Sequence, residues 1–262
     1  MGFLTDINAR SRRDLIERPL DASALMARAT HRPPARDLVG ALRAAAESRG
    51  PAVIAEVKRA SPSAGDMAEG GDISVCAAAY ESGGAAAISV LTEPHHFKGS
   101  LVDLEAVRLT VGIPVLRKDF LIDPAQVIEA RACGADAVLL ITGSLNDAEL
   151  HAMLGATADL GMTALVETHS EEDLDRALAT DAPVVGVNAR DLETLDVDVQ
   201  RALRQLARVP RDRIAVMESG VSTRAHVRAA ADAGASAILV GEALMRSGDP
   251  AAKVRELRGE ES

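Results

Sequence analysis

Tryptophan is absent from this chain, and aromatic residues are scarce, with three phenylalanines and one tyrosine among 262 residues. Cysteine is almost absent as well. Cys76 and Cys133 lie in alanine-rich helical patterns without a Cys or His neighbour at metal-ligand spacing, so we expect two inert core thiols. The adjacent pair His95 and His96 makes a poor chelate without a third ligand. The sequence therefore predicts neither a metal site nor a cofactor.

Long hydrophobic runs are also missing. None approaches the roughly 20 residues of a membrane span. The first six residues lack the apolar core of a signal peptide and the Ser or Thr of a myristoylation motif. We therefore expect a cytoplasmic protein with no membrane partner.

Positive charge is in the minority, because 29 basic residues stand against 39 acidic ones and the formal net charge is -10. Such a balance argues against a surface for nucleic acid or another polyanion. Any anion that binds must meet a local cluster of donors. The candidate cations follow predicted strands and are Lys58, Arg59, Arg117, Lys118 and Arg190.

Short apolar runs recur about every 20 to 30 residues, each followed by a polar turn and a helical pattern. Most are continuous and not alternating, which is typical of parallel strands covered by helices. The eight predicted strands run approximately through residues 52–57, 86–91, 114–117, 137–141, 163–166, 184–187, 214–217 and 237–240. A length near 250 residues and eight such units predict an α/β fold, the (β/α)8 TIM barrel.

A short internal repeat supports repeated units. Glycine followed by small residues leads into a strand at Gly84, Gly134 and Gly234, and such a glycine ends the preceding helix in the left-handed conformation. Helix starts are legible at Asp123, which precedes Pro124, and at Ser170, which precedes acidic residues.

Residues 1–50 precede the first strand and carry two helix-like patterns, around 5–17 and 37–47. We expect this segment to be an N-terminal helical extension of the barrel at 51–262, the whole forming one domain. It is either a plug under the barrel or a cover over its mouth, and the sequence barely separates the two.

The most informative pair is Glu56 and Lys58, at the end of the first predicted strand. Side chains two apart on a strand share a face, so both point the same way. A salt bridge that plugs the barrel floor is one interpretation, and a catalytic pair is the other. Other polar groups also follow strands, and a barrel builds its active site there. They are Lys118, Glu167, Asn188, Arg190, Glu218 and Ser219.

The last two loops predict a phosphate site. Ser219-Gly220 follows strand seven and Gly241-Glu242 follows strand eight, where barrels of this type recurrently bind phosphate. Glu242 conflicts with this unless its carboxylate points outward and only its N–H is used. Apolar residues near the same face are candidates for holding a flat ring, with ordinary loop packing as the alternative. They are Phe97, Phe120, Leu139 and Leu195.

Taken together, the motifs resemble those of the indole-3-glycerol-phosphate synthase family. They are IAEVKRASPS (54–63), SVLTE (89–93) with Phe97 and Gly99-Ser100, PVLRKDF (114–120), LVE (165–167), GVNARDL (186–192), ESGV (218–221) and LVGEALMR (239–246). The seven motifs fall in order over essentially the whole chain. The resemblance implies conversion of 1-(2-carboxyphenylamino)-1-deoxyribulose 5-phosphate to indole-3-glycerol phosphate in tryptophan biosynthesis, with loss of carbon dioxide and water.

By this resemblance, Lys118 is the general acid that protonates the ketone oxygen, helped by burial and cationic neighbours that lower its pKa. Glu56 and Lys58 match the acid–base pair of the later dehydration, and Glu167 matches a catalytic carboxylate. Asn188 orients these groups. The implied substrate-binding residues are Ser61 and Arg190 for the anthranilate portion or its carboxylate, Ser219, Gly220, Gly241 and Glu242 for the phosphate, Phe97, Phe120, Leu139 and Leu239 around the ring, and also Glu218.

Three positions depart from the usual wording of the family: Ala64, Thr168 and Met217. None removes a charged catalytic position, and they leave open a paralogue of a specialised indole pathway. Two other functions stay open. One is an isomerase resembling phosphoribosylanthranilate isomerase, and the other is a catalytically silent barrel that binds a sugar phosphate and regulates a partner. We expect a monomer that acts on a small phosphorylated molecule.

Overall fold

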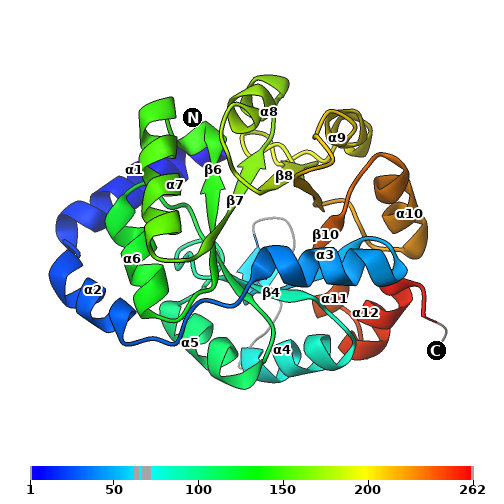
Figure 1. Cartoon of the computed structure of the whole chain (residues 1–262), viewed down its shortest axis with the longest axis horizontal. Helices are drawn as coiled ribbons and strands as arrows, with labels where there is room; N and C mark the ends of the chain where they lie inside the picture. The colour runs from blue at the N-terminus through cyan, green and yellow to red at the C-terminus, as the bar shows by residue number, and fades with distance from the viewer. Residues whose placement is uncertain (1, 62–64, 67–71, 261–262) are drawn as a thin grey trace.

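Eight parallel strands close into a barrel in the computed structural model, which describes residues 2–61, 65–66 and 72–260 (Figure 1). The strands follow one another around the barrel in chain order, and the last one closes the ring by pairing Ala237 with Ala52. The predicted (β/α)8 TIM barrel is confirmed. The barrel strands are β1 (Ala52–Val57), β4 (Ala87–Leu91), β5 (Val115–Lys118), β6 (Ala137–Ile141), β7 (Thr163–Thr168), β8 (Val184–Asn188), β9 (Ile214–Glu218) and β10 (Ala237–Val240).

A two-stranded hairpin of β2 (Ala60–Ser61) and β3 (Gly65–Asp66) follows β1. The predictions that concern Pro62, Ser63 and Ala64 lie outside the described residues.

Helices cover the barrel on its outside (Figure 1). The starts predicted at Asp123 and Ser170 are both present, and each side chain accepts a hydrogen bond from the first turn in a capping box. The outer helices are α4 (Ile73–Ser82), α5 (Leu101–Thr110), α6 (Pro124–Ala132), α7 (Asp147–Asp159), α8 (Glu171–Leu178), α9 (Val199–Leu206), α10 (Arg224–Asp232) and α12 (Pro250–Arg258), with a 3-10 turn η1 (Thr142–Ser144) after β6 and the short α11 (Glu242–Met245) after β10.

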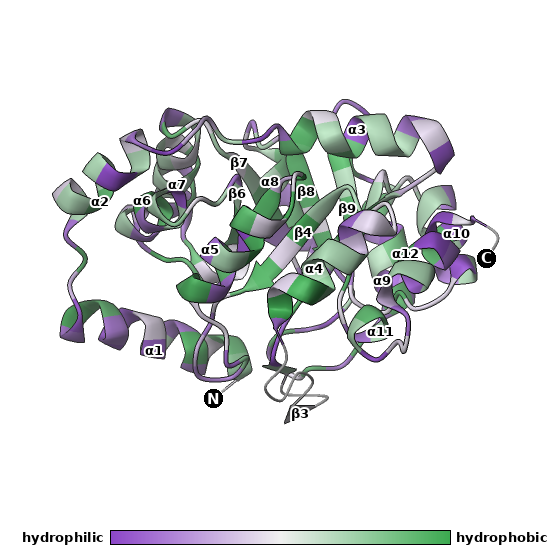
Figure 2. Cartoon of the chain, turned by 90° about the horizontal axis from the view of Figure 1, so that it is seen from below, coloured by the Kyte–Doolittle hydropathy of each residue, from purple (hydrophilic) through white to green (hydrophobic). Residues whose placement is uncertain are grey.

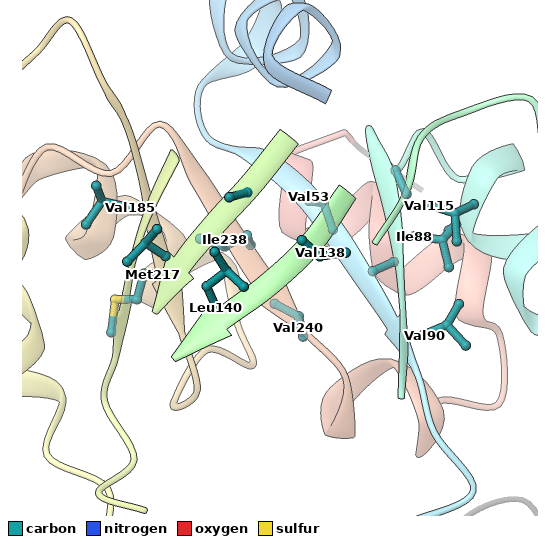
Figure 3. Packing of buried hydrophobic residues seen from close by; sticks show 14 of the residues in the cluster. Val53, Ile88, Val90, Val115, Val138, Leu140, Val185, Met217, Ile238 and Val240 are labelled. Carbon is teal, nitrogen blue, oxygen red and sulfur yellow. The ribbon is translucent and has the colours of Figure 1, made fainter. Parts of the chain in front are cut away.

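The strands divide their side chains between two hydrophobic clusters. Alternate residues such as Val138, Leu140 and Met217 face the helices in the outer cluster (Figure 3). The others fill the barrel interior, among them Ile54, Leu116, Leu139, Leu165, Val216 and Leu239. Met217 therefore packs away from the barrel mouth. Thr168, the other described departure, donates its hydroxyl to the Gly186 carbonyl on β8 at 2.8 Å.

The N-terminal segment forms three helices, α1 (Phe3–Glu17), α2 (Ala22–Thr30) and α3 (Leu38–Arg49), whereas the sequence pattern predicted two. Figure 2 shows α1 and α3 on opposite sides of the barrel. Leu38 and Leu42 of α3 pack against the start of the strands, in the interior cluster. Its Arg43 donates to the carbonyl of Asp212, just before β9, so α3 closes the barrel floor.

Helix α1 lies at the other end, over the loops that follow the strands. The N–H of Leu4 donates to the Leu192 carbonyl after β8, and Phe3 meets the His96 ring edge-on at 5.2 Å. Asp14 lies 3.0 Å from the Nε2 atom of His95, after β4. The segment thus supplies both a floor and a partial cover. The middle helix α2 packs along α6. Among the described helices, none is long and apolar enough to cross a membrane.

Asp136, which lies in one of the Gly-Ala turns, ties the segment to the barrel. This fully buried carboxylate accepts hydrogen bonds from the backbone N–H groups of Arg36 at 2.8 Å and Val115 at 2.9 Å. The Nε atom of Arg108 lies 3.2 Å away. One buried carboxylate therefore connects the chain before α3, the start of β5 and α5.

Replacing Asp136 with alanine is expected to lower the free energy of unfolding by about 3 kcal/mol, because Arg108 and two backbone donors lose a buried partner. Urea unfolding measures this loss. Asp159→Ala, at an exposed position at the end of α7, is the control and is expected to stay within about 0.5 kcal/mol of the wild type. Equal losses in the two variants would contradict this account of Asp136.

Candidate active site

An ammonium group lies between two buried carboxylates at the carboxyl ends of the strands. The Nζ atom of Lys118, the last residue of β5, is 3.0 Å from Oε2 of Glu167 and 3.7 Å from Oε2 of Glu218. Glu167 and Glu218 are 0% and 1% exposed, and their side chains come from β7 and β9. Each follows an inward-facing apolar residue by two positions, so the alternation of the strand aims it into the mouth.

Glu167 is the most contacted member of this cluster. Its Oε1 atom accepts a hydrogen bond from Nδ2 of Asn188 at 3.1 Å, and the Nε2 atom of His169 lies 2.9 Å from the same oxygen. The Oδ1 atom of Asn188 accepts from the backbone N–H of Arg190 at 3.0 Å, which fixes the orientation of the amide. The Asn188 amide thus holds one oxygen of Glu167 in place.

The three charges of the cluster shift one another's protonation. Burial alone would lower the pKa of Lys118, but Glu167, Glu218 and Glu56 together raise it above its ordinary value. The expectation of a pKa lowered toward neutrality is wrong, because the sequence shows which charged residues are present and not which ones surround the amine. Lys118 is fully protonated at neutral pH.

The pKa values of the two carboxyl groups shift in opposite directions. Burial disfavours ionisation of Glu167, but Lys118 and then His169 hold its pKa well below the usual range. Burial, and then the charge of Glu167, raise the pKa of Glu218 well above it. A hydrogen bond between the two carboxyl groups contributes to both shifts. The cluster therefore holds one carboxylate, one ammonium and one neutral carboxyl group.

A glycine on β8 makes room for Glu218. A Cβ atom at Gly186 would lie 2.2 Å from Oε1 of Glu218 and 2.8 Å from a methyl group of Leu165. Any side chain at this position would push Glu218 out of the cluster.

Glu56 and Lys58 form a second acid–base pair. Lys58 Nζ donates to Oε1 of Glu56 at 2.9 Å, with the two side chains 13% and 7% exposed. They share a face, as strand alternation predicts, and they lie at the mouth, whereas a plug would lie at the floor. A Cβ atom at Gly241 would approach Glu56 Oε1 to 2.5 Å and Lys58 Nζ to 3.1 Å. This pair thus lies directly against the loop after β10.

The loops after β9 and β10 have the backbone geometry expected of a phosphate site. Ser219 and Gly220 have φ angles of 61° and 73°, so the chain turns sharply in the left-handed region directly after β9. Gly241 precedes α11. The carboxylate of Glu242 lies 3.1 Å from the Nε atom of Arg246, one turn further along, so it is turned along the helix. This resolves the conflict that its charge raised in the sequence.

Apolar side chains form another wall of the mouth. The rings of Phe97 and Phe120 are 6.4 Å apart, and both belong to the interior cluster that contains Leu139 and Leu239. The buried carboxylate of Glu93 accepts three backbone N–H groups, from His95 to Phe97, and so fixes the loop that carries Phe97.

The remaining predicted cations divide into two groups. Arg190 donates to the Leu195 carbonyl at 2.8 Å, in the loop after β8. Ser61, the other residue expected to bind the anthranilate portion, is buried in β2. Arg59 pairs with Asp103 on α5. Arg117 faces outward, because it alternates with Lys118, and it is 3.0 Å from Asp119 and 3.1 Å from Glu129. Arg59 and Arg117 are therefore structural ion pairs.

His169 is the site residue that the sequence analysis missed. It is 8% exposed and stands two positions after Glu167, so alternation beyond the end of β7 was the available signal. Its partner is visible only once the strands are assembled. Among the described residues, no group of three or more His, Cys, Asp or Glu is arranged to hold a metal ion.

Comparison with known proteins identifies the family. A family model described as indole-3-glycerol phosphate synthase matches residues 4–257. A protein of that name from Mycobacterium avium (strain 104) is 51% identical over 256 residues, which cover 98% of this chain and 90% of that protein. Another, from Mycobacterium tuberculosis (strain ATCC 25618 / H37Rv), is 50% identical over the same shares. This chain belongs to the indole-3-glycerol phosphate synthase family.

Solved structures of more distant proteins share the fold of this indole-3-glycerol phosphate synthase family member. A thiamine phosphate pyrophosphorylase from Pyrococcus furiosus has a TM-score of 0.60 and 17% identity, covering 85% of this chain and 96% of that one. A 3-hexulose-6-phosphate synthase has a TM-score of 0.60 and 23% identity, covering 79% and 98%. At these identities the likeness shows the barrel alone.

Glu218→Gln tests the neutral state of Glu218 in this family member. A carboxyl group whose pKa is raised on folding stabilises the fold fully below its unfolded pKa, and this contribution is lost as pH rises through the folded pKa. Glutamine is neutral at every pH. The variant is therefore expected to gain stability relative to the wild type as pH rises above the ordinary glutamate value of 4.5.

Urea unfolding of both proteins across this pH range measures the difference. Glu172→Gln, on the exposed first turn of α8, is the matched control and is expected to show no such trend. A Glu218→Gln variant that loses stability relative to the wild type as pH rises would mean that Glu218 is ionised in the folded protein.

Proposed function

We propose that this chain converts 1-(2-carboxyphenylamino)-1-deoxyribulose 5-phosphate to indole-3-glycerol phosphate, with loss of carbon dioxide and water, in tryptophan biosynthesis. The observation that carries this proposal is the protonated Lys118, 3.0 Å from Glu167 and 3.7 Å from Glu218 at the barrel mouth of a chain of this family. The substrate offers a ketone, a carboxylate, an aromatic ring and a phosphate, and the mouth has a matching group for each.

Lys118 is the general acid of ring closure. Its ammonium group carries the proton in the resting enzyme, because the surrounding glutamates, with the ionised Glu167 nearest, raise its pKa. As the aromatic carbon attacks the ketone, negative charge develops on the ketone oxygen, and a buried cation stabilises that charge strongly. The Nζ–H bond breaks and the O–H bond forms. Glu167, fixed by Asn188, holds the amine in position.

Glu56 and Lys58 act after decarboxylation. The hydroxyl group needs a proton to leave as water, and the new ring must lose a proton to become aromatic. The hydrogen-bonded pair at 2.9 Å combines a donor and an acceptor at one place, which supports this role. It is a separate ion pair from the one that Lys118 makes with Glu167, so two acid–base centres can serve two stages.

Binding uses the remaining walls of the mouth. Ser219, Gly220, Gly241 and the N–H of Glu242 hold the phosphate, and their contact with the Glu56–Lys58 pair through Gly241 sets the direction of the sugar chain. Phe97, Phe120, Leu139 and Leu239 hold the aromatic ring, Arg190 and Ser61 bind the anthranilate carboxylate, and Glu218 contacts the sugar portion. No cofactor takes part. We further propose that the protein acts as a monomer in the cytoplasm.

The two competing functions have less support. An isomerase resembling phosphoribosylanthranilate isomerase needs one acid and one base, and does not account for two lysines and two glutamates in separate pairs. A silent regulatory barrel has no use for Lys118 or Glu167, yet both are present and buried together.

The test is the fluorescence of the indole product after the carboxyphenylamino substrate is added to purified protein. Because the chain has no tryptophan, the background is low. The wild type is expected to give a steady rise. Lys118→Ala is expected to lower kcat by roughly 100-fold or more, since a lost general acid typically costs that much.

Lys253→Ala is the matched control, because Lys253 lies on α12 and pairs with Glu256 far from the mouth. It is expected to keep wild-type kcat. Thermal stabilisation by the substrate without product formation in the wild type would favour the silent barrel.

A further inference from the structure

The proposed reaction requires a proton from solution in every turnover. The substrate carboxylate leaves as neutral carbon dioxide, and the hydroxyl group leaves as neutral water. Two protons are added, one to the ketone oxygen and one to the departing hydroxyl group, while one is released when the ring becomes aromatic. Charge balance therefore demands a net uptake of one proton, and Lys118 must recover the proton that it gives away.

Bound substrate blocks the direct route to Lys118. The side chain of Lys118 is 15% exposed, at the mouth where the substrate is proposed to lie. The other groups around the amine are glutamate carboxyl groups, and of these Glu167 lies within hydrogen-bond distance. A proton that reaches Lys118 under a bound substrate must therefore come through the carboxyl group of Glu167.

His169 contacts Glu167 from the opposite side. Its Nε2 atom is 2.9 Å from Oε1 of Glu167, whereas Lys118 bonds to Oε2, so the carboxyl group bridges the two. Apart from the ion-pair contact of Nε2 with Glu167, neither ring nitrogen of the buried His169 has a hydrogen-bond partner among the described residues. An imidazole takes up and releases protons near neutral pH, and its two nitrogens can serve two sides.

Behind His169 lies a polar pocket of about 460 Å³ under the N-terminus of α1. Gln205, which is 1% exposed, lines it, and neither atom of its amide has a partner within the described part of the chain. Arg201 also lines the pocket, and its Nε atom has no hydrogen-bond partner among the described residues. Unpaired buried polar groups around a pocket of this size are typical of a site for bound water. The exposed residues Glu171 and Glu193 at its edge open it to solvent.

The charges that face His169 come from every neighbouring element. Glu167 lies on β7, Asp173 on α8, Asp191 in the loop after β8 and Arg201 on α9. The edge adds Glu171 and Glu193, while α1 and η1 contribute Leu4 and Gly143, which do not titrate. Most of the charged groups around His169 are therefore acidic.

We propose that His169 carries protons from this pocket to Glu167 and thereby restores the general acid Lys118. After Lys118 gives its proton to the ketone oxygen, the Nε2–H bond of protonated His169 breaks and an O–H bond forms on Oε1 of Glu167. The carboxyl group turns about its last C–C bond and releases the proton to the neutral amine. His169 then takes up a proton from solution, which water in the pocket passes on, so that no hydroxide is left behind. His169 acts through Glu167 and is a positioning and relay residue, without contact to the substrate.

The test is the steady-state kinetics of His169→Gln in the full chain. Glutamine keeps a nitrogen donor near Glu167 but carries no exchangeable charge. The variant is expected to lose about 100-fold in kcat, at the low end of what a lost acid–base group costs, with an unchanged KM. Added imidazole is expected to restore kcat in proportion to its protonated fraction. His169→Asn, with a shorter amide, provides the same test if the glutamine variant fails to fold.

His151→Gln is the matched control, because His151 lies exposed on α7 with its Nδ1 atom on the Asp147 carbonyl. It is expected to keep wild-type kcat. A folded His169→Gln with wild-type kcat, or one whose lost activity imidazole does not restore, would overturn the relay and leave a structural role. A wild-type protein that forms no indole product would instead overturn the proposed function on which the relay rests.

Discussion

The contact between Lys118 and the two buried carboxyl groups of Glu167 and Glu218 constrains the rest of the site. One ammonium group cannot compensate two carboxylates in a buried space, so the cluster keeps a proton on Glu218 and a negative charge on Glu167. The surroundings enforce this division. Of the two carboxyl groups, Glu167 is the one that Asn188 and His169 contact. Gly186 leaves space for Glu218 without supplying a hydrogen bond.

The barrel mouth holds this cluster and a second acid–base pair, which serve the two stages of the proposed reaction. Along each strand, an inward-facing apolar residue comes first and the acid–base group follows at the mouth. The charged groups of the site are therefore separate from the apolar core that stabilises the fold. The Glu56–Lys58 pair lies against Gly241 of the proposed phosphate loop, whereas Lys118 lies on β5, separated from β1 by β4. Helix α3 closes the floor, and α1 covers loops at the mouth.

Much of this organisation could be predicted from the sequence. Continuous apolar runs and Gly-Ala turns marked all eight strands, and polar residues at strand ends marked the mouth. Features that depend on assembled neighbours could not be predicted. The pKa of Lys118 rises because glutamate side chains from three other strands surround it, and only the assembled barrel brings them together. Helix α2 has no local signal that separates it from an ordinary connection, and the alternation that places His169 beside Glu167 does not reveal their contact before the strands are assembled.

The charge state of the Lys118 cluster is the central claim, and isotope-edited infrared spectroscopy of the substrate-free protein tests it most directly. With ¹³C-labelled glutamate, the wild type at neutral pH is expected to show the carbonyl band of a buried protonated carboxyl group, and this band is expected to disappear in Glu218→Gln. The absence of such a band in the wild type, or its persistence in the variant, would contradict the account, because both carboxyl groups would then be ionised or another residue would hold the proton.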